Sequence, residues 1–247
     1  MDSVATVSER PGRTTAQRLD EASERSQRLG ATAPPEPPVA AILPRQRGRP
    51  RDQDSAATRL RILDVAMVMF ARDGYEATTN RSIAESSGLT SGAIYHYFSS
   101  KAELYVAVYE VVVERVFSRL ETAIAGRHSL VEQYAAVLDA VAELNRADPT
   151  LPAFVVGVAS DAQRHPELDP LLRPLRRRTA AFFHQLVADA AGRGELSPDT
   201  DLRAVEDLLN AVVSGLARLS AVTRDPRRHA AAVDALQQFF AGTLITR

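Results

Sequence analysis

Tyr95 and His96 are adjacent side chains that both donate and accept hydrogen bonds, and they lie in a short segment of helical pattern. Ile94 and Phe98 are four residues apart and would bury on one face of that helix, which leaves Tyr95 and His96 for other faces. A phenol and an imidazole on an exposed helix can contact base edges or phosphates of DNA. A solvated turn residue remains the alternative reading for His96.

The surrounding residues, 78–101, predict two short helices around a tight turn and a third helix directly after them. Thr79 and Thr90 are residue types that cap helix N-termini. Gly88 lies where the first short helix must end, because glycine adopts a left-handed conformation without a Cβ penalty. Ser100 and Glu103 have the spacing of a reciprocal capping box. This layout can place the second short helix in the major groove of DNA.

A wider set of residues, from Gly74 to Leu104, carries a recognisable pattern. It consists of Gly74-Tyr75, Thr78-Thr79, Ile83-Ala84, Ser87-Gly88-Leu89-Thr90, Gly92-Ala93-Ile94-Tyr95-His96-Tyr97-Phe98 and Ser100-Lys101-Ala102-Glu103-Leu104. This pattern resembles the DNA-binding domain of the TetR (tetracycline-repressor-like) family of bacterial transcription regulators. Asn80 departs from the family pattern, which usually has an aliphatic residue there, and Ser91 stands where a basic residue is common.

The resemblance implies a set of DNA contacts on and around the second short helix. Tyr95 and His96 are the foremost candidates, followed by Ser91, Gly92, Ala93 and Tyr97. Thr79 and Arg81 would anchor the DNA backbone. Lys101 is the only lysine of the chain, and it lies in the first turn of a helix, where an ammonium group can meet a phosphate.

Residues 45–51 contain four arginines together with Gly48 and Pro50, a composition that disfavours a stable helix. One interpretation is a solvated linker. The other is an arm that lays Arg47 and Arg49 into an A·T-rich minor groove, because narrow minor grooves attract arginine. Residues 1–44 are rich in Ser, Thr, Ala, Arg, Glu and Pro, and we expect the whole arm, 1–54, to be disordered.

Composition is consistent with a cytoplasmic regulator. The net charge of −1 over 247 residues requires any affinity for phosphate to come from a local patch. The absence of cysteine excludes disulfides, thiol catalysis and cysteine-bound metal centres. No apolar run approaches the ~20 residues of a membrane span. No histidine has a glutamate three residues before it, and no His-Glu-x-x-His or Gly-x-Ser-x-Gly pattern occurs, so we predict neither an enzyme nor a bound metal or cofactor.

Long stretches of helical periodicity and weak strand signals predict an all-α fold. We expect an N-terminal three-helix DNA-binding head with a helix-turn-helix, over residues 55–117 with its motif at about 79–98. A C-terminal helical bundle for ligand binding and dimerisation would follow over residues 118–247. The expected helices cover about 55–73, 100–125, 129–146, 151–164, 169–192, 201–223 and 226–243, besides the two short ones.

The last two helices, 201–223 and 226–243, are apolar over more than one face, which suggests a subunit contact as well as a core. The family resemblance implies a homodimer that reads a palindromic operator in double-stranded DNA. It also implies a small apolar effector in the body, although aromatic residues at helical spacing are more often plain core. A helical protein-interaction adaptor without operator binding is the alternative. The pocket candidates are Tyr134, Phe154, Val155, Val158, Phe182, Phe183 and His184.

Overall fold

The computed structural model describes residues 51–244, with side chains from Asp54 onward. Over that range the chain is helical and contains no strand, so the predicted all-α fold is confirmed for the part described. The expectations for residues 1–50 of the disordered arm, and for Arg47 and Arg49 within it, lie outside the described residues. Residues 51–54 were also expected to be disordered, but they are helical.

The head contains α2 (Arg51–Ala77), α3 (Asn80–Ser86) and α4 (Ser91–Tyr97). α2 begins four residues earlier than the expected start at residue 55, so it takes in the last arginine of the 45–51 segment. Its regular helix is broken at Gly74, which has a φ of 79°. A side chain is strained in that conformation, which explains why the helix is interrupted at a glycine.

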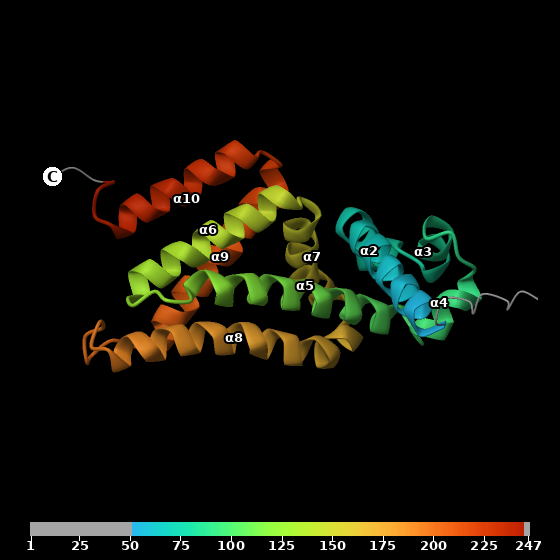
Figure 1. Cartoon of the computed structure of the whole chain (residues 1–247), viewed down its shortest axis with the longest axis horizontal. Helices are drawn as coiled ribbons and strands as arrows, with labels where there is room; N and C mark the ends of the chain where they lie inside the picture. The colour runs from blue at the N-terminus through green and yellow to red at the C-terminus, as the bar shows by residue number, and fades with distance from the viewer. Residues whose placement is uncertain (1–50, 245–247) are drawn as a thin grey trace, which may run out of the picture. The chain divides into compact units, whose positions relative to one another are not determined.

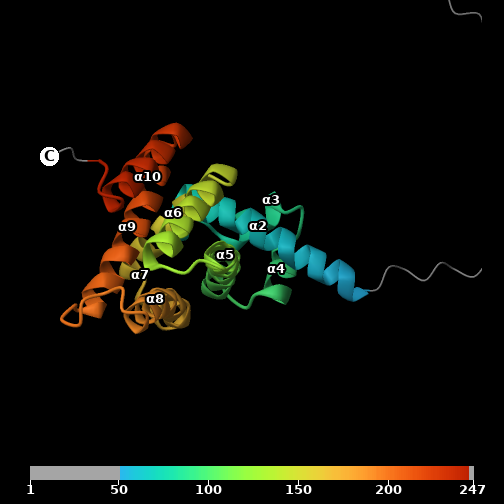
Figure 2. The same ribbon diagram turned by 60° about the vertical axis from the view of Figure 1, so that its left-hand side comes forward.

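The remaining helices agree with the expected ranges to within one residue, apart from α10, which ends three residues earlier. Figures 1 and 2 show α6 and α8 beside α5, and the connection from α2 to the body runs through contacts with α5 and α7. The elements are α5 (Lys101–Ile124), α6 (Leu130–Ala147), α7 (Thr150–Arg164), the 3-10 helix η1 (Pro166–Leu168), α8 (Asp169–Gly192), α9 (Leu202–Thr223) and α10 (Pro226–Phe240).

Leu60 and Val111 belong to the apolar helical pattern of α2 and α5, yet both are exposed. The buried face of α2 is formed by Ile62, Leu63, Ala66 and Phe70. The apolar pattern of each helix is thus wider than the face that the neighbouring helices cover.

Two helix caps of the head differ from the predicted pattern. Thr79 caps α3 in a reciprocal capping box with Ser82, which the sequence reading did not identify. Ser100 accepts a hydrogen bond from the Glu103 N–H (3.1 Å), as expected. The Glu103 carboxylate, however, accepts from the Ser99 N–H (2.7 Å) rather than from the Ser100 N–H. One half of the predicted capping box is thus confirmed. The other half is wrong, because Glu103 bonds to the backbone of the residue before Ser100.

Replacing Asn80 with leucine is expected to stabilise the head. Asn80 is buried at the start of α3, and its side-chain oxygen has no hydrogen-bond partner within the described residues. An unsatisfied buried acceptor costs about 1–3 kcal/mol, so an apolar side chain of similar size should raise the free energy of unfolding by about 1 kcal/mol. Urea unfolding would measure the change.

The matched control is Asn145→Leu. Asn145 is also buried, but its Nδ2 lies 3.5 Å from His229 Nε2. The same substitution therefore removes a hydrogen-bond partner of His229, whereas at Asn80 it removes an acceptor that has no partner. We expect this control to lose stability. A loss of stability in Asn80→Leu as well would contradict the interpretation of Asn80.

Candidate nucleic-acid interface and ligand cavity

The turn between α3 and α4 is fixed by backbone hydrogen bonds around Gly88. The Leu89 N–H donates to the Ala84 carbonyl (2.9 Å), and the Gly88 N–H donates to the Glu85 carbonyl (3.2 Å). Gly88 has a φ of 67°, which places it in the left-handed region where a side chain would be strained. Thr90 then caps α4 through the Ala93 N–H (3.3 Å). The orientation of α4 is therefore set locally by the chain on its N-terminal side.

α4 is anchored to the core by Ile94 and by Phe98 directly after it, and both are fully buried. Tyr95 is 58% exposed and His96 is exposed as well, so the two foremost candidates lie on the free face of the helix. Tyr97 packs partly against the core and makes an edge contact with the His96 ring, with ring centroids 5.2 Å apart. This geometry orients the imidazole without covering it.

The other candidates for DNA contact differ in how exposed they are and in whether their side chains are already bonded within the protein. Gly92 is exposed, while Ser91 and Ala93 are partly covered. Thr79 uses its side chain in the cap of α3, and Arg81 is exposed but paired with Glu85 (2.9 Å) on the same helix. An exposed ion pair of this kind contributes little stability, so the Arg81 guanidinium can exchange its partner for a phosphate.

Lys101 makes contacts inside the protein that the sequence did not reveal. Its ammonium group donates to the carbonyls of Tyr75 (2.8 Å) and Glu76 (3.3 Å), and it lies 4.2 Å from the centroid of the Tyr75 ring. These contacts satisfy carbonyl groups at the end of α2, after the break at Gly74. A phosphate contact by Lys101 stays a prediction, and it would have to compete with these partners.

Asp161 of α7 joins the body to the head. It is 2% exposed, and its Oδ2 accepts hydrogen bonds from the Tyr105 hydroxyl (2.8 Å) and from the Tyr75 N–H (3.2 Å). Arg164 donates to the other oxygen, Oδ1 (2.8 Å). Burial raises the pKa of Tyr105, so its hydroxyl stays protonated and able to donate. We call these residues, Asp161, Tyr75, Tyr105 and Arg164, the junction cluster.

A cavity of about 420 Å³ lies in the body beside α7. Its walls are mostly aliphatic and aromatic, and this size and composition are typical of small-molecule sites. Polar groups reach it from Tyr109, Arg176, Thr179 and from α9. The apolar part is formed by Val112, Val113, Val116, Phe117, Leu120, Val141, Val155, Val158, Ala159, Ala180, Phe183, Val213 and Ala217.

Some of the predicted pocket residues line the cavity, and others lie outside it. Val158 and Phe183 line the cavity, as does Val155. Phe154 is buried against Tyr105 in the core, and Tyr134 donates its hydroxyl hydrogen bond to the Leu209 carbonyl (2.8 Å). Phe182 packs on Phe117, outside the cavity lining. His184 is exposed, and its Nδ1 lies 2.8 Å from Glu206 Oε1.

Two carboxylates are buried in the body. They are Asp161 in the junction cluster and Glu206 at the cavity wall. Glu206 accepts from the Arg203 guanidinium (3.2 Å) and contacts His184, so its charge is paired. An acidic residue on an amphipathic helix gives no signal of burial when its partners come from distant segments.

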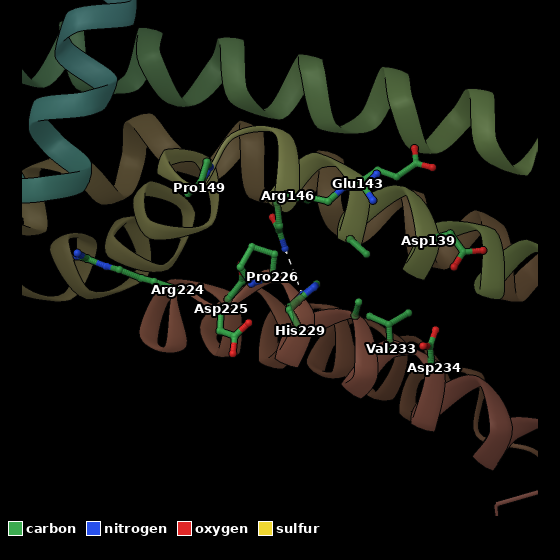
Figure 3. Close-up of a pocket in the computed structure, with 14 residues that line it drawn as sticks. Asp139, Glu143, Arg146, Pro149, Arg224, Asp225, Pro226, His229, Val233 and Asp234 are labelled. Carbon is green, nitrogen blue, oxygen red and sulfur yellow. Dashed lines mark hydrogen bonds between the residues drawn. The ribbon is translucent and has the colours of Figure 1, made fainter.

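A second hollow, about 290 Å³, lies between α6 and α10 (Figure 3). Asn145 and His229 are both buried and meet across it. Burial lowers the pKa of His229, so the imidazole is neutral near pH 7. Its rim mixes carboxylates with arginines, among them Glu143 and Arg146. The Asn145–His229 contact fixes α10 against α6. No group of three or more metal-ligating side chains occurs within residues 54–244.

The fold and the exposed face of α4 define a helix-turn-helix DNA-binding protein with a helical body. Residues 62–108 match the model for bacterial regulatory proteins of the tetR family, and residues 131–245 match the C-terminal domain of BetI-type transcriptional repressors. The chain belongs to the TetR family of transcriptional regulators. None of its helices between residues 51 and 244 is sufficiently long and apolar for a membrane span.

Known proteins resemble the chain along most of its length. The transcriptional regulator UidR of Escherichia coli (strain K12) is 28% identical over 192 residues, which cover 77% of this chain and 95% of UidR. The structure of Salmonella enterica GusR is 26% identical with a TM-score of 0.63, covering 76% and 95% of the two chains. FadR from Bacillus subtilis, solved with stearoyl-CoA, has a TM-score of 0.67 at 17% identity and covers 75% and 99%.

Proposed function

We propose that the protein is a ligand-responsive transcriptional repressor that binds a palindromic operator as a homodimer. The single observation that carries this proposal is α4, a helix whose core face is buried and whose free face presents Tyr95 and His96. A helix held in this way can enter a major groove with its side chains toward the base edges. Two copies related by a two-fold axis would read half-sites about 34 Å apart or more.

The dimer contact is supported by apolar side chains that the single chain leaves uncovered. Leu208, Ala211, Gly215 and Val222 of α9 are exposed at intervals of three, four and seven residues, which place them along one side of the helix. A Cβ built on Gly215 would meet no atom within 4 Å, so the small residue is not required by packing inside the described chain. Phe239, Phe240 and Leu244 are exposed nearby in the sequence, at the end of the chain.

The cavity supports the ligand-responsive part of the proposal. α7 forms one wall with Val155, Val158 and Ala159, and Asp161 follows on the same helix. A ligand that favours one position of α7 would favour one position of the head through the junction cluster. Affinity for the operator would then change by the difference in ligand binding between the two arrangements.

The decisive experiment is selection of operator sequences from a random DNA library with the full chain, followed by a salt titration. We expect enrichment of an inverted repeat and an affinity that falls steeply with salt. The adaptor alternative predicts no preference for any inverted repeat. It also predicts that partner binding through α9 and α10 survives replacement of Tyr95 and His96.

Replacing His96 with alanine is expected to weaken binding to the selected operator about tenfold, because one lost polar contact to DNA is worth roughly 1–3 kcal/mol. The side chain is exposed, so the thermal midpoint should stay within about 1 °C of the parent value. Fluorescence anisotropy with labelled operator would measure the affinity. His128→Ala is the matched control, since His128 is also exposed but lies between α5 and α6. Equal losses in the two variants would argue against a specific role for His96.

A further inference from the structure

The Tyr109 hydroxyl is the clearest unused hydrogen-bonding group of the cavity. Tyr109 is 9% exposed, it lines the cavity from α5, and its hydroxyl has no hydrogen-bond partner within the described residues. The oxygen is nevertheless not sealed in the core, unlike the orphaned atoms of Asn80 and Ser87. A hydroxyl that is accessible at a cavity wall and has no protein partner is free to hydrogen-bond with a molecule that enters the cavity.

The protonation state of this phenol determines which kind of guest it suits. Burial raises the pKa of Tyr109, and the positive charge of Arg176 offsets this only in part, so the group is a neutral hydroxyl at physiological pH. A phenol of this kind can donate its hydrogen to an oxygen atom of a ligand. By contrast, the buried hydroxyls of Tyr105 and Tyr134 are already committed to Asp161 and to the Leu209 carbonyl.

Arg176 lines the same cavity from α8, where its side chain is exposed and ion-paired with Asp169. Its hydrogen bonds within the described residues all run from Nη2 to Asp169, which leaves Nε and Nη1 available. A guanidinium presents its donors in a plane that matches the two oxygens of a carboxylate. The Glu206 carboxylate at the opposite wall is occupied by Arg203 and His184. Tyr109 and Arg176 can therefore both donate hydrogen bonds to one ligand.

We propose that the cavity binds an amphipathic carboxylate, with its oxygens at Tyr109 and Arg176 and its hydrocarbon part against the valines of α5 and α7. This inference rests on the proposed ligand-responsive function and specifies the class of ligand. Hydrogen-bond donors already in place offset the free-energy cost of removing the carboxylate from water. The apolar walls favour burial of the hydrocarbon part. Neither a long-chain amine nor a purely apolar molecule uses both donors.

Three probes of equal chain length test the ligand class: decanoate, decan-1-ol and decylamine. Calorimetric titration into the full chain without DNA should give decanoate an affinity at least about tenfold higher than either of the other two, because a hydrogen bond to a charged group is the stronger kind. Equal affinity for the three probes, or a preference for the amine, would overturn the proposal.

Tyr109→Phe removes only the hydroxyl and should lower decanoate affinity about tenfold, with decylamine unaffected. Tyr134→Phe is the matched control, because it removes a buried hydroxyl that lies outside the cavity lining and should leave decanoate affinity unchanged. Arg176→Gln, at an exposed position, tests the same site if the Tyr109 variant folds poorly. Unchanged decanoate affinity in both cavity variants would overturn the assignment.

Release of operator DNA is measured separately, so failure of the proposed ligand class can be distinguished from failure of the proposed regulatory function. Operator binding without decanoate binding would refute the ligand class and leave the DNA-binding function standing. Decanoate binding that depends on Tyr109, without any effect on the operator, would support the ligand class and refute ligand-responsive regulation.

Discussion

Asp161→Ala is expected to lower the free energy of unfolding by about 3 kcal/mol. The substitution removes the acceptor of two buried donors, the Tyr75 N–H and the Tyr105 hydroxyl. Each donor left unsatisfied in the interior costs about 1–3 kcal/mol. Arg164 is exposed and can return to water, so its lost ion pair adds little. Urea unfolding at neutral pH would measure the loss.

Asp161→Asn provides the graded comparison, because its amide oxygen can still accept while the charge is lost. We expect it to recover more than half of the stability that Asp161→Ala loses. Asp64→Ala, at an exposed acidic residue on α2, controls for removal of a carboxylate and should stay within about 0.5 kcal/mol of the parent. An equally small change in Asp161→Ala would mean that the junction cluster does not hold α7 against the head.

Leu208→Glu is expected to weaken both dimerisation and operator binding by at least about 100-fold. In a two-fold contact through α9 the substitution appears in both subunits, and each buried unpaired carboxylate costs several kcal/mol. Leu208 is exposed in the single chain, so the fold of one subunit should survive the change. Sedimentation equilibrium would measure the association, and anisotropy with the inverted-repeat operator would measure DNA binding.

The control for this variant is Val111→Glu. Val111 is 41% exposed and Leu208 is 54% exposed, but Val111 lies on α5 and not on α9 or α10. The control should remain dimeric with full affinity for the operator. If Leu208→Glu also remained dimeric, the subunit contact would have to lie on a surface other than α9.

Much of the fold was predictable because its signals are local. Caps such as Thr90, the glycine at position 88 and the period of apolar residues determine where helices begin, end and bury themselves, and those residues are neighbours in sequence. The free face of α4 followed from the four-residue spacing of Ile94 and Phe98. These features depend on interactions within one or two turns, which periodicity describes well.

Contacts between distant segments could not be predicted in the same way. Asp161 meets Tyr75 and Tyr105 across 86 and 56 residues of sequence, and nothing local distinguishes it from a surface carboxylate. Lys101 was expected at a phosphate because its helix position suits one, yet its ammonium group reaches carbonyls 25 and 26 residues earlier. Such partners are known only once the helices are packed.

The placement of Val158 and Asp161 on one helix has an evolutionary consequence. The two residues are three positions apart, about 4.5 Å of helical rise, so the cavity wall and the carboxylate that contacts the head lie within one turn. The cavity wall is built from many hydrocarbon side chains, whereas the contact with the head depends on the single side chain of Asp161. Substitutions in the cavity wall can therefore change ligand specificity step by step while the contact between α7 and the head is kept. This makes the chain a convenient starting point for tailored biosensors.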